Sequence, residues 1–289
     1  MRDMFHVLLY TVDNDPEARL ILLIALRANI TTIRSTQPHG ASFDQEHGVL
    51  ELARATKKHE IWTIELPGLK TEMLLREHGF IVTPIDHHTY GELDRVHDPI
   101  TCERKKSSLE QFLAMAQITN DDLRSWGFDP RTVLGVGVMD DRFAHGLRSE
   151  GFTPKEVLRV LNFRKKLHIQ IDPNYMASLR AAKKVWQDRQ AVNGYFVCES
   201  NFDVRIAYAL GILTIEQGED EHPVIISDRN GRQCYANNLR QEEIQHLTTY
   251  FREFHTFTYG SGRCWGIDND RRDTQVTLND VIHALSIRD

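Results

Sequence analysis

Short apolar runs alternate with longer stretches of helical periodicity along the first half of the chain. The apolar runs have the length of strands and cover residues 5–11, 60–66, 80–85 and 133–139, the last of them rich in Gly and Val. The stretches between them predict helices, at residues 17–29, 47–57, 70–78, 108–117 and 121–126. This alternation predicts an α/β fold with a mostly parallel sheet and helices on both faces.

The pattern changes in the second half of the chain. A strongly basic helical region follows residue 153 and runs to about residue 190, with a break near Asp172-Pro173. Its cations indicate either a solvated helix face or a wall that faces the substrate. Beyond it, the sequence predicts strands at residues 195–199, 223–227 and 232–237, and helices at residues 201–216, 241–254 and 278–287. The Asn230-Gly231 dipeptide predicts that the second and third of these strands form a hairpin. We therefore expect a domain at residues 1–153, a helical connector at 154–192 and a smaller α/β domain at 193–289.

Composition narrows the class of protein without identifying a function. The 289 residues carry a net charge of −6, which argues against tight non-specific binding to long duplexes but not against a short phosphorylated substrate. The four cysteines are scattered and form no CxxC pair, so neither a zinc ribbon nor a disulfide framework is expected. No apolar run is long enough to span a membrane, and the N-terminus shows no secretion signal. We expect a cytoplasmic protein with reduced thiols.

Polar clusters follow the predicted strands at four places: Asp13 and Asp15, Glu65, Asp86-His87-His88, and Asp140 and Asp141. The carboxyl ends of parallel strands form the edge where ligands bind in open sheets. Carboxylates in one crevice repel one another unless a cation neutralises them, and together with imidazole they suit Mn²⁺ or a similar ion. Two such ions can clamp the attacking and leaving oxygens of a phosphoryl transfer.

Each cluster also has a purely structural interpretation. The segment from Asp13 to Pro16 can form a turn with a helix N-cap, Glu65 can end a strand, and Asp140 and Asp141 can lie in a surface loop. A calcium-binding loop is not matched, because Ala18 stands where glycine is required. Of the four clusters, Asp86-His87-His88 is the one that a purely structural role explains least well.

These residues resemble the motifs of the DHH phosphoesterase superfamily. Asp86-His87-His88 resembles its signature tripeptide, residues 8–15 its first motif of a strand followed by Asp-x-Asp, and Glu65 its acidic second motif. Either Asp140 or Asp141 matches the aspartate downstream of the tripeptide. The C-terminal module resembles the associated DHHA1 domain and includes the sequence Tyr259-Gly260-Ser261-Gly262-Arg263. The resemblance covers nearly the whole chain.

The resemblance implies a role for each matching residue. Metal would be coordinated by Asp13, Asp15, Glu65, His87 and one of Asp140 and Asp141, with Glu65 bridging two ions of Mn²⁺ or Mg²⁺. Asp86 and His88 would be catalytic, Asp86 by orienting its neighbours and His88 by contacting the substrate phosphate. The nucleophile would be a water that the two ions activate. A further phosphate contact across the cleft between the domains would come from Gly260, Ser261, Gly262 and Arg263.

Three positions depart from the family pattern. Leu9 stands where many relatives have a histidine ligand, Glu65 replaces the usual bridging aspartate, and Arg263 replaces the last residue of a Gly-Gly-Gly-His motif. These departures keep a second class of function open, that of a degenerate centre that senses a nucleotide or serves as a partner subunit.

The leading hypothesis is a metal-dependent phosphodiesterase that hydrolyses short oligonucleotides, single-stranded nucleic-acid ends or cyclic dinucleotides. A pyrophosphate or polyphosphate hydrolase is the third hypothesis, ranked last because the C-terminal module resembles the nucleotide-handling type. The expected partner is a nucleotide or a short single-stranded nucleic acid rather than a membrane, and a homodimer is left open.

Overall fold

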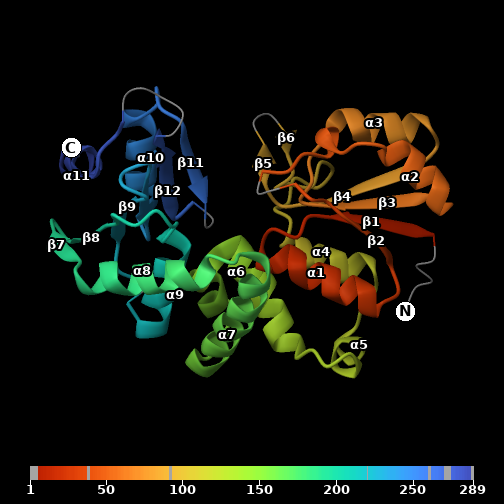
Figure 1. The fold of residues 1–289 in the computed structure, drawn as a ribbon, viewed down its shortest axis with the longest axis horizontal. Coiled ribbons are helices and arrows are strands. Elements are labelled where there is room, and N and C mark those ends of the chain that lie inside the picture. The colour runs from red at the N-terminus through yellow and green to blue at the C-terminus, as the bar shows by residue number, and fades with distance from the viewer. Residues whose placement is uncertain are drawn as a thin grey trace. The chain divides into compact units, whose positions relative to one another are not determined.

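The computed structural model describes residues 6–37, 40–90, 93–219, 221–259, 262–269 and 275–287. The chain divides into two compact units, one made of residues 1–141 and 146–172 and the other of residues 142–145 and 173–289. Each unit has its own main sheet, with helices packed on both faces (Figure 1). None of the helices in the described ranges combines the length and the apolar composition that crossing a bilayer requires.

The first unit is built on a four-stranded parallel sheet with the strand order β2-β1-β3-β4. Its strands are β1 (Val7–Thr11), β2 (Thr31–Arg34), β3 (Glu60–Ile64) and β4 (Ile81–Ile85). Its helices are α1 (Pro16–Arg27), η1 (Phe43–Gln45), α2 (Val49–Thr56), α3 (Leu69–Glu77), α4 (Ser108–Met115), α5 (Asn120–Ser125), α6 (Pro130–Ser149, part of which belongs to the second unit) and α7 (Pro154–Ile171). A short antiparallel pair, β5 (Thr89–Tyr90) and β6 (Leu93–Asp94), follows β4.

Helices cover both faces of this sheet, as the continuous apolar strands predict. All five residues of β1 are buried, and alternate side chains enter different cores. Val7 and Leu9 pack with residues of α1, α4, α6 and α7, whereas Leu8 and Tyr10 pack with residues of η1, α2 and α3. Figure 1 shows α1 and α4 on one side of the sheet and α2 and α3 on the other. The predicted α/β fold with a mostly parallel sheet is confirmed.

All four strands end at the same level. Arg34, Thr11, Ile64 and Ile85 form one row across the sheet, because Thr11 is paired with both Arg34 and Ile64, and Ile64 with Ile85. The segments that follow these strands therefore start from one edge, which brings residues that are distant in sequence to the same place.

One predicted strand is wrong. Residues 133–139 lie in the first half of helix α6, which begins at Pro130 and is capped by the side chain of Asp129. The valines of this short apolar segment favoured a strand, whereas its glycines allow close packing of the helix. A Cβ atom on Gly135 would lie 2.3 Å from Cγ2 of Val160 on α7, so only glycine lets the two helices approach this closely.

The second unit contains a six-stranded mixed sheet with the order β11-β12-β10-β9-β8-β7, in which β8 and β9 are parallel and the other pairs antiparallel. Helices α8 and α9 pack on one face, and α10 and α11 on the other. The elements are α8 (Tyr175–Gln187), β7 (Gln190–Val192), β8 (Tyr195–Glu199), α9 (Ala207–Gln217), β9 (Val224–Asp228), β10 (Gln233–Asn237), α10 (Gln241–Tyr250), β11 (Thr256–Tyr259), β12 (Cys264–Asp268) and α11 (Leu278–Ser286).

The predicted hairpin in this unit is confirmed by the antiparallel pairing of β9 with β10. One expectation needs correction. The helix expected from residue 201 begins only at Ala207, because residues 201–206 form a connection and the N–H groups of Ile206 and Ala207 donate to the carboxylate of Asp228 at the start of the helix. Strands β11 and β12 were not predicted, since neither carries a long apolar run.

Candidate metal centre

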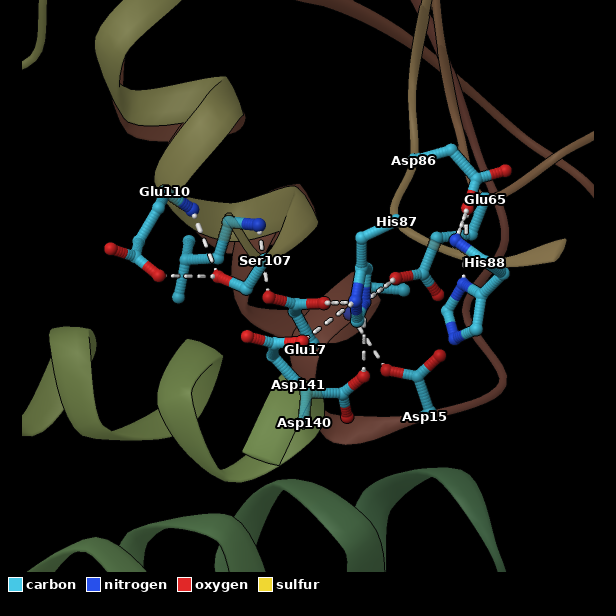
Figure 2. Close-up of polar contacts among 12 residues, drawn as sticks. Asp15, Glu17, Glu65, Asp86, His87, His88, Ser107, Glu110, Asp140 and Asp141 are labelled. Atoms are coloured by element: carbon cyan, nitrogen blue, oxygen red, sulfur yellow. Dashed lines mark hydrogen bonds and ion pairs between the residues drawn. The ribbon is translucent and has the colours of Figure 1, made fainter. Parts of the chain in front are cut away.

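The carboxyl edge of the parallel sheet gathers most of the predicted site residues (Figure 2). Asp15 follows β1, Glu65 follows β3, and the tripeptide that begins at Asp86 follows β4. Asp140 and Asp141 reach the same place from helix α6 and not, as expected, from the end of a strand. The ends of three strands and helix α6 therefore bring these predicted residues together.

His87 lies at the centre of the cluster, and its side chain is only 4% exposed. Its Nε2 atom lies 3.4 Å from Oε1 of Glu65, 3.5 Å from Oε2 of Glu17 and 3.5 Å from Oδ2 of Asp140. Its Nδ1 atom lies 3.7 Å from Oδ1 of Asp141. Figure 2 shows these carboxylates converging on the ring from several elements. One imidazole thus meets four acidic side chains.

Glu17 is a site residue that the sequence interpretation missed. It lies in the first turn of α1 and is fully buried, and its Oε1 atom accepts a hydrogen bond of 2.9 Å from the backbone N–H of Leu109. A signal was available, because Glu17 precedes the buried residues Leu20 and Ile21 by three and four positions and so lies on the buried face of the helix.

The Glu65 backbone adopts a left-handed conformation, with φ of 48°, directly after β3. Its N–H donates to the carbonyl oxygen of Ile85 at 3.1 Å, which ties the residue to the end of the neighbouring strand. Such conformations cost of order 1–3 kcal/mol for a residue other than glycine and cluster at functional sites. The local fold therefore directs the Glu65 side chain to His87 at the expense of backbone strain.

Asp86 holds His88 in place. The buried carboxylate of Asp86 accepts hydrogen bonds of 3.0 Å from the backbone N–H of His88 and 3.0 Å from its Nδ1 atom, with Tyr90 Oη at 3.3 Å. Because Nδ1 carries the proton in this arrangement, Nε2 of His88 is left as the nitrogen that can bind a ligand. The His88 ring lies beside that of His87, with 4.2 Å between the ring centroids.

Two arginines fix the acids of α6. Nη2 of Arg164 lies 3.2 Å from Oδ1 of Asp140, and Nη2 of Arg104 lies 2.6 Å from Oδ1 of Asp141. Arg164 is buried and also donates to the carbonyl oxygen of Val136, at 2.8 Å. This cation of the basic helical region is therefore neither on a solvated helix face nor on an open wall. Neither arginine was predicted as part of the site.

Asp15 serves two purposes at once. Its Oδ1 atom accepts the N–H of Ala18 at 2.9 Å, so it is the N-cap of α1 that the structural interpretation proposed. It also lies close enough to the cluster to be affected by it, because burial and the charges of Glu65 and Asp140 raise its pKa well above the ordinary value.

Asp13 is held differently from the other predicted ligands. Its Oδ2 atom lies 2.7 Å from Nη1 of Arg19 and 3.0 Å from Nε of Arg34. In the described part of the chain, the donor atoms that lie within 4.8 Å of one another belong to Glu65, His87, His88 and Asp140. Asp13 is not one of these residues. The structure thus places Asp13 in a small ion-pair network beside the cluster.

The electrostatics of the cluster favour a bound cation. Burial opposes the charged form of His87, but contacts with Asp140, Asp141, Glu17 and Glu65 outweigh it and raise the pKa of the imidazole far above its ordinary value. Burial, followed by the charge of Asp140, raises the pKa of Glu17 well above the ordinary value of a carboxyl. An excess of buried acid that must share one imidazole is the situation that a divalent ion relieves.

The donor atoms also fit such an ion geometrically. Nε2 of His87, Oε2 of Glu17 and Oε1 of Glu65 are buried without a hydrogen-bond partner in the described ranges. Donor atoms of Glu65, His87, His88 and Asp140 lie within 4.8 Å of one another. Neighbouring ligands held at about 2.1 Å by one octahedral ion lie about 3.0 Å apart, near the spacing around His87. Mixed carboxylate and imidazole ligands suit Mn²⁺ and related ions.

The predicted phosphate-binding loop belongs to the second unit. Gly260 and Ser261 lie outside the described residues. Gly262 has a φ of 75° in the turn after β11, and Nη1 of Arg263 lies 3.2 Å from Nδ1 of His145. The role of this loop stays a prediction.

Known proteins resemble this chain in fold rather than in sequence. No family model and no curated protein matches it. Among solved structures, an exopolyphosphatase-related protein from Bacteroides fragilis has a TM-score of 0.51 and 12% identity, with 97% of this chain and 91% of that chain covered. The exonuclease RecJ bound to manganese has a TM-score of 0.46 and 12% identity, covering 96% of this chain and 88% of that chain.

The pGpG-specific phosphodiesterase PggH from Vibrio cholerae has a TM-score of 0.37 and 9% identity, with coverages of 97% and 96%. The likeness to the Bacteroides protein, which extends over both units, confirms the fold that the resemblance to DHH phosphoesterases implies.

Proposed function

We propose that this chain is a metal-dependent phosphoesterase of the DHH type. Its substrates would be phosphodiesters in short oligonucleotides, single-stranded nucleic-acid ends or cyclic dinucleotides. The observation that carries the proposal is the surroundings of His87, where carboxylates of Glu17, Glu65 and Asp140 lie within 3.5 Å of one nitrogen atom. The fold shared with an exopolyphosphatase-related protein supports the same class of chemistry.

One group of residues would hold the metal ions, and another would contact the substrate phosphate. His87, Glu65, Glu17 and Asp140 would hold Mn²⁺ or Mg²⁺, and bound ions would supply positive charge that activates water and neutralises a phosphate group. Asp86 orients His88 through its Nδ1 atom. The His88 side chain is 43% exposed, so its Nε2 atom can contact a phosphate oxygen and hold a proton there.

Turnover by the purified protein tests the proposal. The substrates would be linear and cyclic diadenylate, with pyrophosphate as the comparison that the hydrolase alternative requires. We expect Mn²⁺-dependent cleavage of a diadenylate that EDTA abolishes and fresh Mn²⁺ restores. Faster cleavage of pyrophosphate than of both diadenylates would favour the pyrophosphatase alternative instead.

Replacing Asp86 separates catalysis from folding. Asp86→Ala should abolish turnover while the circular dichroism spectrum stays that of the parent, because it removes the group that orients His88. Asp94→Ala is the matched control, since Asp94 has a half-exposed side chain paired with His97 and lies outside the cluster. A well-folded Asp86→Ala protein that retains full turnover would contradict the proposal that this chain is a phosphoesterase of the DHH type.

The arrangement of Asp13 favours a second candidate function, a nucleotide sensor or partner subunit without turnover. One expected metal ligand is held by two arginines, and Leu9 replaces another. This alternative predicts that a diadenylate raises the melting temperature while no product forms in Mn²⁺. Product accumulating from the bound diadenylate would exclude it.

A further inference from the structure

We propose that a groove beside helix α7 binds a small aromatic anion of the nucleoside monophosphate class, at a site separate from the metal centre. The groove lies within the first unit, between α7 and the segment that joins α5 to α6. The proposal goes beyond the proposed function and does not depend on it. It gives a role to cations of the basic helical region that do not take part in the acidic cluster.

The groove has a volume of about 500 Å³, which is within the range of small-molecule sites. Phe128, Thr132 and Val133 line one side of it. The residues that line it from α7 recur at intervals of three and four and therefore share one face of the helix. They are Lys155, Leu158, Arg159, Asn162, Phe163 and Lys166. Apolar and basic side chains of one helix face thus border the same space.

The apolar part of the groove suits a flat ring. Phe128 and Phe163 both line it, and both are only partly buried where they pack against the core of the unit. Leu158 adds a side chain that is 44% exposed. Stacking on an aromatic side chain is worth about 1–3 kcal/mol per base. The exposed amide of Asn162 can bind the polar edge of a heteroaromatic ring, which an aliphatic ligand lacks.

The charges around this surface favour an anion. The one carboxylate that lines the groove, that of Asp129, accepts a hydrogen bond of 2.5 Å from Oγ1 of Thr132 and lies 3.4 Å from Nη1 of Arg159. Lys155 and Lys166 are exposed and form no ion pair or hydrogen bond within the described part of the chain. The groove therefore keeps an excess of positive charge in a chain whose net charge is −6.

The spacing along α7 determines the size of the ligand. Arg159 precedes Phe163 by four residues and Lys166 follows it by three, so both cations lie within about 6 Å of Phe163 along the helix axis. Lys166 is the cation without a carboxylate partner. In a nucleoside monophosphate, one sugar separates the phosphate from the base, which fits a ring against Phe163 and a phosphate at Lys166.

Binding in the groove should need no divalent ion, because lysine and arginine supply the positive charge. The acidic cluster around His87 repels phosphate when no cation is bound. An anion that binds to metal-free protein therefore binds outside the metal centre.

Calorimetric titration in EDTA with AMP, adenosine and inorganic phosphate tests the proposal. We expect AMP to bind, and adenosine and phosphate to bind at least about tenfold more weakly, because each lacks one of the two contacts. Lys166→Ala should weaken AMP binding about tenfold, and Phe163→Leu by a similar factor. Phe163→Tyr keeps the ring and should bind AMP as the parent does.

The matched control is Lys165→Ala, which removes the neighbouring charge on the same helix but does not alter the lining of the groove. The proposal is overturned if AMP does not bind in EDTA, if adenosine binds as tightly as AMP, or if Lys166→Ala and Lys165→Ala bind AMP equally well. Lys166 is exposed, so its replacement should leave the fold intact, and circular dichroism checks this. If Phe163→Leu does not fold, the two lysine variants still decide.

Hydrolysis of a diadenylate in Mn²⁺ is measured separately. Absence of product would end the proposed function, whereas the affinities for AMP in EDTA would still decide whether the groove is a binding site.

Discussion

Oε2 of Glu17 lies 3.5 Å from Nε2 of His87, while the other carboxylate oxygen of Glu17 accepts the backbone N–H of Leu109 at 2.9 Å. One oxygen therefore fixes the carboxylate against α4, and the other faces the imidazole at the centre of the candidate site. Helix α1 thereby contributes both to the core of the first unit and to its chemistry.

Replacing Glu17 should weaken metal binding without unfolding the protein. Glu17→Gln keeps an acceptor for the Leu109 N–H but removes the negative charge, and we expect the affinity for Mn²⁺ to fall at least about tenfold. Calorimetric titration of metal-free protein with Mn²⁺ measures the change. Glu110→Gln is the control, because Glu110 contacts Ser107 and Lys106 rather than His87. Equal Mn²⁺ affinity of the parent and Glu17→Gln would remove Glu17 from the ligand set.

The close packing of α6 on α7 makes a stability prediction. A Cβ atom on Gly135 would lie 2.3 Å from Cγ2 of Val160, so Gly135→Ala should lower the free energy of unfolding by about 1–3 kcal/mol. Denaturant titration measures it. Val160→Ala opens space at the same contact, and the double variant should lose less stability than the sum of the two single losses. Strict additivity would show that the two side chains do not meet.

Thiol reactivity should distinguish one cysteine from the other three. Cys102 is exposed, whereas burial raises the pKa of Cys198 to about 12 and that of Cys264 to about 11, with Cys234 also buried. Only the thiolate is nucleophilic, so iodoacetamide at pH 8 should rapidly modify one thiol in the folded protein and all four after unfolding. Mass spectrometry counts the adducts. Rapid modification in a folded Cys102→Ser protein would contradict the burial of the remaining thiols.

His168 should make the protein less stable in mild acid. Burial, followed by the positive charge of Arg164, lowers the pKa of His168 to about 4, although Asp172 opposes the shift. The unfolded chain, with an ordinary histidine pKa of about 6.5, binds more protons between these values, so the free energy of unfolding falls as the pH drops through this window.

Comparison with His168→Gln isolates this contribution from those of other groups. The variant should lose about 2 kcal/mol less than the parent between pH 7 and pH 5. Denaturant titrations at the two pH values provide the four free energies. The same pH dependence in both proteins would mean that His168 titrates alike in the folded and unfolded chains.

The part of the site that could be predicted from the sequence is the part carried by local motifs. The apolar run before Asp86 and the acidic residue after β3 were recognisable because strand, turn and polar residue follow one another directly. Glu65 and the tripeptide do lie together at the edge of the sheet. The metal-binding roles that the resemblance implies stay predictions until metal affinity is measured.

The features that were missed depend on contacts between distant segments. Strand β2 is short and only partly buried, and its pairing with β1 rather than its own pattern defines it, so Arg34 could not be placed. Residues 133–139 were assigned to a strand because they form a short apolar run rich in Val, which is typical of a strand, while the cap at Asp129 and the contact of Gly135 with α7 decide for a helix. To predict Glu17 as a site residue, its position on the buried face of α1 would have had to be weighed against its charge, which is typical of an exposed residue.

Asp140 and Asp141 are consecutive on α6, yet they meet different nitrogens of the same ring, with Oδ2 of Asp140 3.5 Å from Nε2 and Oδ1 of Asp141 3.7 Å from Nδ1 of His87. An α-helix advances by about 100° per residue, so the number of residues between the cap at Asp129 and these acids sets the directions in which both carboxylates point. Adding or removing one residue in that segment would rotate both away from the imidazole. The length of this segment is therefore constrained more strictly than its composition, and single-residue insertions there should cost more activity than substitutions.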